Sequence, residues 1–139
     1  MLGLMQSQPL LISSLIEFAE RHHGDAEIVS RRVEGDIHRY TYRDLAARAR
    51  RLSNALDALQ LGFSDRVATL AWNGYRHMEM YFGVSGSGRV LHTVNPRLHP
   101  DQIAWIINHA EAQALCFDTT SPPLVHAAHA KRPTPNTWV

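Results

Sequence analysis

Nine histidines and a single cysteine are the first side chains to consider as metal ligands, bases or nucleophiles in this sequence. His126 and His129 are three residues apart and could share one face of a helix, but no third ligand lies near them. The chain has no H-E-x-x-H and no C-x-x-C motif. We therefore predict no metal site, and we expect His92 and His109, near the ends of predicted elements, to have packing or capping roles.

Phosphate-binding loops are the second kind of chemistry to consider. Gly86-Ser87-Gly88 would begin a G-x-G-x-x-G loop, but position 91 is a leucine, and the segment follows a predicted helix and opens a strand instead of the reverse. The only lysine, Lys131, precedes Arg132-Pro133 with no glycine nearby, and the hydroxyl-rich segment 119–123 has neither glycine nor lysine. We interpret the glycines at 86 and 88 as the end of a helix and a tight turn.

Cys116 lies in the apolar run Ala114–Phe117, which favours a buried and unreactive thiol. A single cysteine excludes an internal disulfide, and the formal net charge of +1 gives no strong field for nucleic acid or anionic lipid. No segment has the length of apolar sequence that a membrane helix needs, and residues 1–12 lack the basic start of a signal peptide. We expect a cytoplasmic protein with no nucleic-acid partner.

The elements that must position these residues alternate between strands and helices. Three β-branched or apolar runs, 66–71, 89–94 and 114–117, are separated by helical patterns at 75–85 and from Pro100 onward. This order predicts an α/β fold with a parallel β-α-β-α-β sheet and right-handed crossovers. A short helix over 124–130 is also possible.

A helix and a hairpin are predicted to precede this sheet. Ser14 and Glu17 have the spacing of a capping box and open a helix toward Arg21, and strands 27–33 and 37–42 flank a turn at 34–36. Thr41 is placed to cap the long helix that follows, with Asp44 three residues on. We predict that Gly62 stops that helix and that Asn73 caps the next one.

The loops 72–74 and 95–98 follow two strands of the predicted sheet. In parallel sheets ligands bind at the carboxyl ends of the strands, so these two loops are the local candidates for a binding site. The aromatic and methionine side chains nearby are expected to form core or interface packing.

The residues in these segments resemble the N-terminal portion of acyl-CoA synthetases of the adenylate-forming (AMP-dependent synthetase and ligase) superfamily. The likeness is greatest to the medium- and long-chain fatty-acid and methylmercaptopropionate CoA ligases, and it covers nearly the whole chain, tail included. No single segment is a catalytic signature; the order and spacing carry the resemblance. The segments are Tyr40-Thr41-Tyr42 with Leu45-Ala46, Leu61-Gly62 with Asp65-Arg66-Val67-Ala68, Trp72-Asn73-Gly74-Tyr75-Arg76-His77, His92-Thr93-Val94-Asn95-Pro96-Arg97-Leu98, and Asn108-His109-Ala110-Glu111.

The resemblance implies a reaction in which ATP and magnesium join a carboxylate, such as a fatty acid, to AMP, after which the acyl group passes to coenzyme A. The family's Gly/Ser/Thr-rich phosphate loop ending in Pro-Lys, its magnesium-binding glutamate and its C-terminal lysine have no counterpart here. We therefore assign no catalytic, cofactor-binding or metal-binding residue, and expect no cofactor for this chain alone. Ser64 stands where the family has glycine and Arg89 where it has a small residue, and both are expected to destabilise the chain locally.

Three functional hypotheses follow. The first is an incomplete N-terminal synthetase domain over 1–139, made of a helix and hairpin (1–40), an α/β unit (41–118) and a proline-rich tail (119–139), and inactive alone. The second is a non-catalytic α/β module that pairs with itself or with a complementing polypeptide through an exposed apolar face. The third, a small nicotinamide-dependent oxidoreductase, is disfavoured by the misplaced glycines at 86 and 88.

Overall fold

A four-stranded parallel sheet forms the centre of the molecule. The computed structural model describes residues 3–4, 6–129 and 137–139. The strand order is β4-β3-β5-β6, made of β3 (Arg66–Leu70), β4 (Val90–Thr93), β5 (Ala114–Phe117) and β6 (Thr137–Trp138). The parallel pairing of the first three strands confirms the predicted sheet, whereas the short β6, which pairs with the outer side of β5, was not expected.

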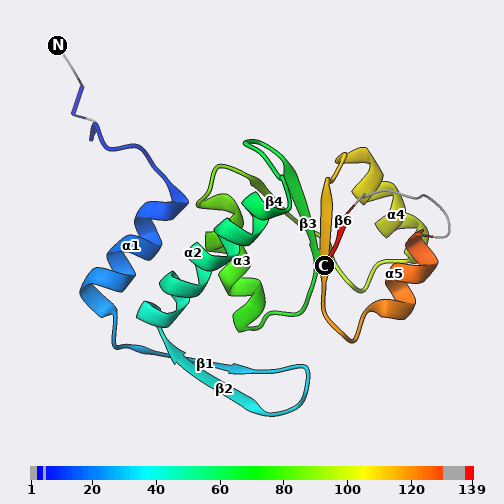
Figure 1. The fold of residues 1–139 in the computed structure, drawn as a ribbon, viewed down its shortest axis with the longest axis horizontal. Coiled ribbons are helices and arrows are strands. Elements are labelled where there is room, and N and C mark those ends of the chain that lie inside the picture. Colours follow the sequence, from blue (N-terminus) through cyan, green and yellow to red (C-terminus); the bar gives the residue numbers. More distant parts are fainter. Residues whose placement is uncertain (1–2, 5, 130–136) are drawn as a thin grey trace.

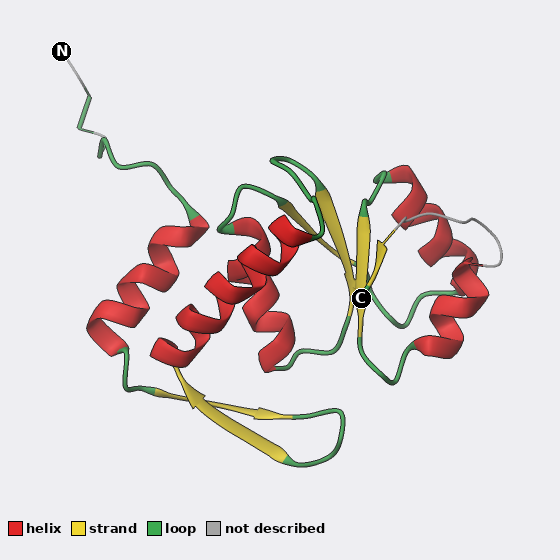
Figure 2. Ribbon diagram, viewed as in Figure 1, coloured by secondary structure: helices red, strands yellow, loops and turns green. Residues whose placement is uncertain are grey.

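Helices cover the sheet on both sides and give an α/β layered fold (Figures 1 and 2). On one side lie α2 (Tyr42–Ala58) and α3 (Tyr75–Ser85), with α1 (Ile12–His23) outside them. The other side carries α4 (Pro100–His109) and α5 (Pro122–His129). An antiparallel hairpin of β1 (Glu27–Arg31) and β2 (Ile37–Thr41) lies below α1–α3, and the described residues before α1 project away from the body. Within the described residues no helix is both long enough and apolar enough to cross a bilayer.

Apolar cores on the two sides of the sheet hold these layers together, and a third core joins α1 and the hairpin to α2 and α3. Leu70 and Leu115 pack with Ile103 and Ile107 of α4 and with Val125 of α5. On the opposite side the buried residues are Leu56, Leu61, Val67, Val84 and Ala114. Burying such side chains contributes about 1.5–3 kcal/mol each relative to leaving them in water.

The capping box predicted for α2 is confirmed. The Thr41 side chain accepts a hydrogen bond from the Asp44 backbone N–H at 3.2 Å, and the Asp44 carboxylate accepts one from the Thr41 N–H at 3.0 Å. That bond, together with one from the Thr41 hydroxyl, lowers the pKa of Asp44. The carboxylate also lies at the positive end of the helix, where its charge is stabilising.

The capping box predicted for α1 is wrong. The helix begins at Ile12, and its N-cap, Leu11, makes no side-chain cap. Ser14 is already inside the first turn, and its hydroxyl donates back to the Leu11 carbonyl at 2.7 Å. A capping box requires the serine at the N-cap position, but Ser14 lies inside the first turn, so its hydroxyl is not placed to accept from the N–H groups that follow it.

Two further helix ends also differ from the prediction. The first turn of α3 is capped by Ser30 of β1, whose hydroxyl accepts a hydrogen bond from the Tyr75 N–H at 3.1 Å; Asn73 makes no cap. The α2 helix ends at Ala58, and Gln60, with a φ of 60°, makes the left-handed turn that was expected near Gly62.

The hairpin turn at 34–36 is confirmed, but β1 ends at Arg31, two residues earlier than expected. Arg32 forms a bidentate ion pair with Asp36, and its backbone N–H donates to the Asp36 carbonyl at 2.9 Å, so the turn begins there. The helix α5 begins at Pro122, two residues before the predicted start, and Ala130, its predicted end, lies outside the described residues.

The two departures from the family pattern lie in neighbouring segments, Ser64 in the loop before β3 and Arg89 in the turn from α3 into β4. Gly88 has a φ of +80°, and its carbonyl accepts a hydrogen bond from the Ser64 N–H at 2.9 Å. Ser64 itself has a φ of 65°, a conformation in which a side chain is strained. Arg89 is 7% exposed and fully partnered, because its guanidinium donates to the Leu61 carbonyl, to Asp57 and to Ser87. Arg89 therefore has the hydrogen-bond partners that a buried charge requires. Backbone strain is present at Ser64.

Candidate functional site

The loops that follow β3 and β4 meet at one edge of the sheet, as the sequence predicted. Together they line a cleft of about 330 Å³ whose walls carry more polar than apolar surface. Besides His77 and Arg97, its polar side chains are the amides and hydroxyls of Asn73, Tyr81, Thr93 and Asn95. Amide and hydroxyl groups of this kind can orient a polar ligand, but they do not form a nucleophile and base pair.

His77, in the first turn of α3, lies in the wall of this cleft and was not singled out from the sequence. It is 6% exposed, and its Nε2 is 3.0 Å from the hydroxyl of Thr69 in β3. Burial lowers the pKa of His77, and the charge of Asp118 opposes this only in part. The imidazole is therefore neutral at pH 7, and its contact with Thr69 holds α3 against the sheet.

Asp118, directly after β5, fixes the loop that follows β3. Its carboxylate accepts a hydrogen bond from the Trp72 N–H at 2.7 Å, and the Trp72 indole N–H donates to the Thr120 hydroxyl at 3.2 Å. On the cleft side, the guanidinium of Arg97 lies 5.8 Å from the centre of the Trp72 ring. The strand ends therefore present a cation on an aromatic face, an arrangement that favours a polar or anionic ligand.

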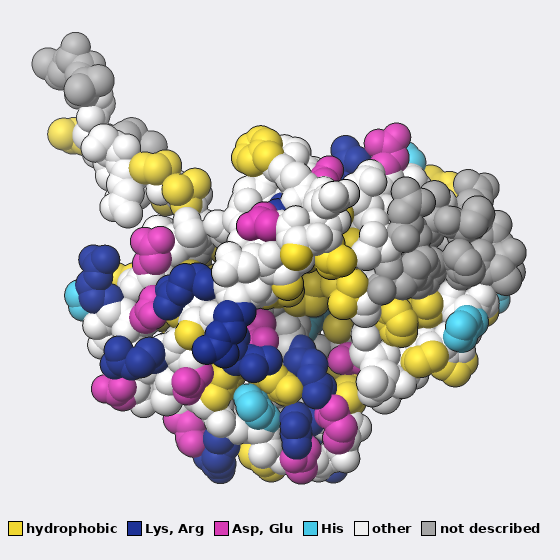
Figure 3. All heavy atoms as spheres, in the orientation of Figure 1, with side chains coloured by type: hydrophobic (Ala, Val, Ile, Leu, Met, Phe, Trp, Pro, Cys, Tyr) yellow, Lys and Arg dark blue, Asp and Glu magenta, His cyan; other side chains and the backbone are white. Residues whose placement is uncertain are grey.

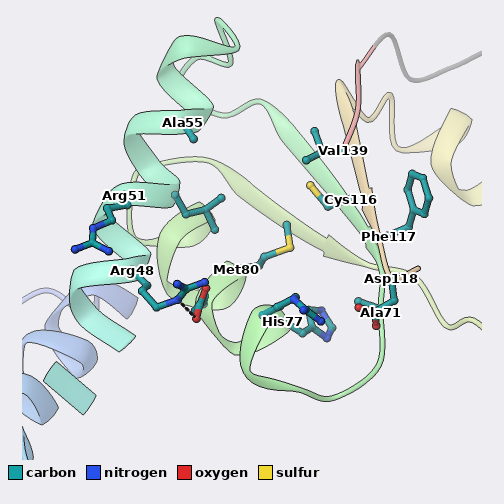
Figure 4. Close-up of a pocket in the computed structure, with 13 residues that line it drawn as sticks. Arg48, Arg51, Ala55, Ala71, His77, Met80, Cys116, Phe117, Asp118 and Val139 are labelled. Atoms are coloured by element: carbon teal, nitrogen blue, oxygen red, sulfur yellow. Dashed lines mark hydrogen bonds and ion pairs between the residues drawn. The ribbon is translucent and has the colours of Figure 1, made fainter. Parts of the chain in front are cut away.

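A second and more apolar cleft, of about 440 Å³, lies between α2 and the β5–β6 half of the sheet (Figure 4). Its floor includes Met80 and Cys116, and Arg48 and Arg51 project from α2 along its wall. Arg48 donates to the buried carboxylate of Glu79 at 2.6 Å. Burial raises the pKa of the Cys116 thiol to about 11, which favours the protonated, weakly nucleophilic form at neutral pH, and the side chain is half-buried where the sequence predicted a buried one.

The glycines at 86 and 88 hold no ligand site. Gly86 is the C-cap of α3, and the Ser87 hydroxyl donates to the Gly83 carbonyl at 2.7 Å, closing the last turn of that helix. A side chain at Gly88 would meet the Phe63 ring at 2.8 Å, so the space beside the turn is already filled. The segment is a helix end and a turn, as the sequence indicated.

The histidines whose side chains are described do not gather into a metal site. Across residues 3–4, 6–129 and 137–139 no group of three or more His, Cys, Asp or Glu side chains could hold a metal ion. His109 stacks on Trp105 with ring centres 4.6 Å apart, and burial with the charge of Arg66 lowers the pKa of His92. His126 is exposed on α5, and the side chain of His129 lies outside the described set.

The sequence of this chain is similar to those of known proteins over most of its length. A family model described as "AMP-binding enzyme" matches residues 15–138. The chain is 54% identical over 127 residues to a 3-methylmercaptopropionyl-CoA ligase of Ruegeria lacuscaerulensis, covering 91% of this chain and 24% of the relative. It is 45% identical over 133 residues to a medium-chain-fatty-acid–CoA ligase of Ectopseudomonas oleovorans, covering 96% of this chain and 24% of the relative. The chain thus spans about a quarter of the length of these curated relatives.

Solved structures share the fold. A fatty acyl CoA synthetase of Mycobacterium tuberculosis matches with a TM-score of 0.78 at 22% identity, over 93% of this chain and 26% of that one. The anthranilate CoA ligase AuaEII matches with a TM-score of 0.80 at 19% identity, over 96% of this chain and 26% of that one. The α/β arrangement of this chain is therefore that of the corresponding part of these proteins.

Proposed function

This chain belongs to the family of AMP-binding enzymes, and from that membership we propose that it forms the opening α/β part of the N-terminal domain of an acyl-CoA ligase. The observation that carries the proposal is the family match over 15–138, joined to 54% identity with a 3-methylmercaptopropionyl-CoA ligase. We propose a carboxylic acid of the methylmercaptopropionate or fatty-acid type as the substrate of the complete enzyme, supported by the names of the relatives. We also propose that the chain divides into a helix and hairpin (1–40), an α/β unit (41–118) and a tail (119–139), and that it is located in the cytoplasm.

The role we propose for these residues is that of a scaffold. A parallel sheet holds ligands at the carboxyl ends of its strands, and here those ends carry Asn73, Asn95 and Arg97 around one cleft. The neutral His77 and the Asp118 carboxylate hold the surrounding backbone in place. We infer that the cleft contributes polar contacts to a site completed by other parts of the ligase.

ATP, magnesium and coenzyme A serve the complete ligases, but the residues described here do not fit them. No acidic or histidine cluster suits a metal ion, and the glycine-containing turn at 86–88 is filled by Phe63. Stabilising a transferring adenylyl group requires cations and amide donors arranged around it. We therefore propose that the 139-residue chain alone does not catalyse adenylation.

A carboxylate-dependent ATP–pyrophosphate exchange assay tests this proposal. The purified chain is incubated with ATP, magnesium, labelled pyrophosphate and either 3-methylmercaptopropionate or a medium-chain fatty acid, with a complete ligase as the positive control. We expect no exchange above the enzyme-free blank. Robust exchange by the chain alone would contradict its role as an inactive part.

A second candidate function, a non-catalytic module that pairs with itself, is favoured by exposed apolar side chains on α1. Leu15 is 61% exposed and Phe18 is 58% exposed, on a helix that packs outside α2. Apolar groups in such a position favour association between copies. Size-exclusion chromatography with light scattering over a range of concentrations tests this candidate, and a clean, stable monomer would count against it.

A further inference from the structure

We propose that the open cleft between α2 and the β5–β6 half of the sheet, which we call the α2–β5 cleft, is a docking surface for the polypeptide that carries the remainder of an acyl-CoA ligase. This inference rests on the proposed function and names the partner and the surface that it uses. The occupant is a segment of that polypeptide with apolar side chains and one carboxylate, which would lie against Arg51.

Uneven coverage of the sheet is the first support. Parallel sheets are normally covered on both faces. At the start of β5, Ala114 is buried beneath the α2–α3 layer, but Cys116, two residues later on the same side, borders the α2–β5 cleft. Val139, directly after β6, lines the cleft and is 59% exposed. Around Cys116, which is half-buried, this side of β5 is therefore less closely covered than the opposite side, where Leu115 is 1% exposed.

The chemistry of the walls indicates what would cover the cleft. Leu52, Met80 and Cys116 give it an apolar floor, and in Figure 3 dark blue arginine side chains border a yellow apolar hollow near the middle of the face. Arg48 is paired with Glu79, and Arg76 with Glu34. Arg51 also lines the cleft but has no ion-pair partner within the described part of the chain. An apolar segment bearing a carboxylate complements this combination.

The share of the relatives that this chain covers indicates the source of that segment. The matched stretch accounts for 24% of the Ruegeria lacuscaerulensis ligase and 23% of the Ruegeria pomeroyi ligase. The rest of such a ligase is therefore a polypeptide about three times longer, and a parallel sheet with one half-covered face is a surface for it to complete. A second copy of this chain is the competing occupant.

Co-expression tests the proposal. The probe is the part of the Ruegeria pomeroyi 3-methylmercaptopropionyl-CoA ligase that follows the matched stretch, tagged and purified with this chain. We expect a one-to-one complex. Ala55 is exposed and lines the cleft one helical turn after Arg51, so Ala55→Glu occupies the free arginine and puts a carboxylate into the cleft. Because such a change leaves a charge poorly solvated at the interface, we expect Ala55→Glu and Arg51→Glu each to weaken the complex about tenfold or more.

Matched controls separate the cleft from the rest of the surface. Ala58→Glu changes an exposed alanine of the same helix outside the cleft, and Arg21→Glu makes the same charge reversal on α1. Both should bind like the wild type. Equal binding by all five proteins would overturn the proposed surface, and so would the absence of any complex.

Cys116 supplies a second readout, because it is the only cysteine of the chain and lies in the cleft. Peptide mass spectrometry follows its alkylation by a small maleimide. We expect the rate to fall about tenfold or more in the complex, since a covered thiol reacts only when the interface opens. An unchanged alkylation rate in the complex would overturn the proposal. Protection of Cys116 in the isolated chain that increases with concentration would also overturn it, because a second copy would then be the occupant.

Pyrophosphate exchange is measured on the same complex. A stable but inactive complex would contradict the proposed function while leaving the docking surface supported.

Discussion

Two neighbouring residues of β5, on opposite faces of the sheet, are covered to different extents. Leu115 points into the layer formed by α4 and α5 and is 1% exposed, whereas its neighbour Cys116 borders the open α2–β5 cleft. On the covered face, apolar burial contributes to the stability of the chain itself. On the open face, the same kind of surface remains available to stabilise an association. The comparison therefore separates residues that fold this chain from residues that we expect to recognise a partner.

Truncating one residue on each face gives the largest expected difference. Leu115→Ala should lower the free energy of unfolding by about 3 kcal/mol, because it leaves a cavity in a closed core. Cys116→Ala should cost about 1 kcal/mol or less, because the cleft beside it is already open. Urea denaturation followed by circular dichroism measures both. Similar losses for the two variants would show that the open face is packed as tightly as the covered one.

Two arginines extend the comparison to polar contacts. Arg89 is buried and joins the start of β4 to the end of α2, so Arg89→Ala leaves the Leu61 carbonyl without its partner and should cost about 2 kcal/mol. Arg51→Ala, at the open cleft, should change stability by no more than about 0.5 kcal/mol. The same denaturation experiment applies, and a large loss for Arg51→Ala would show that it stabilises the chain itself.

A stabilising substitution is expected in the loop that leads into β3. Ser64 adopts a φ of 65°, which glycine accepts without steric strain. Ser64→Gly should therefore raise the free energy of unfolding by about 0.5 kcal/mol, the relief of strain being offset in part by the greater freedom of glycine in the unfolded chain. Ser53→Gly, in the interior of α2, should instead destabilise, which separates the left-handed position from a general effect of glycine.

The smallest effect that we predict is a dependence on pH through His77, which borders both the strand-end cleft and the α2–β5 cleft. Burial lowers its pKa in the folded chain, so the unfolded chain takes up a proton first as the pH falls below about 6.5. Stability should therefore decrease from pH 7.5 to pH 5.5. In His77→Gln this decrease should be shallower, whereas His126→Gln, which alters an exposed side chain on α5, should follow the wild type.

The order of the elements could be predicted from the sequence because their signals are local. The apolar runs between the helical patterns predicted β3, β4 and β5. Thr41 and Asp44 predicted the start of α2. The helix ends that were missed depend on other signals. The cap of α3 comes from Ser30 in the hairpin, which no local pattern reveals. The turn after α2 is made by Gln60, a residue that seldom adopts a positive φ.

In the candidate site, too, the features with a local sequence signal were predicted and those that depend on contacts between elements were missed. The meeting of the loops after β3 and β4 follows from parallel pairing and was predicted. His77 and Asp118 were missed because their roles depend on contacts with Thr69 and Trp72 in another element. Thr69 lies in a strand and His77 lies in the first turn of the helix that follows it. This spacing is a signal that could have indicated their contact.

The Ser30–Tyr75 hydrogen bond has a consequence for the order of folding. It joins residues 45 positions apart, so the first turn of α3 gains its cap only after the hairpin has docked. The cap therefore cannot help α3 to nucleate, and it should form late, after the sheet and its crossover helices. A substitution such as Ser30→Ala should accelerate unfolding while leaving the refolding rate nearly unchanged. The docked hairpin would then slow the unfolding of the native chain without affecting how fast it folds.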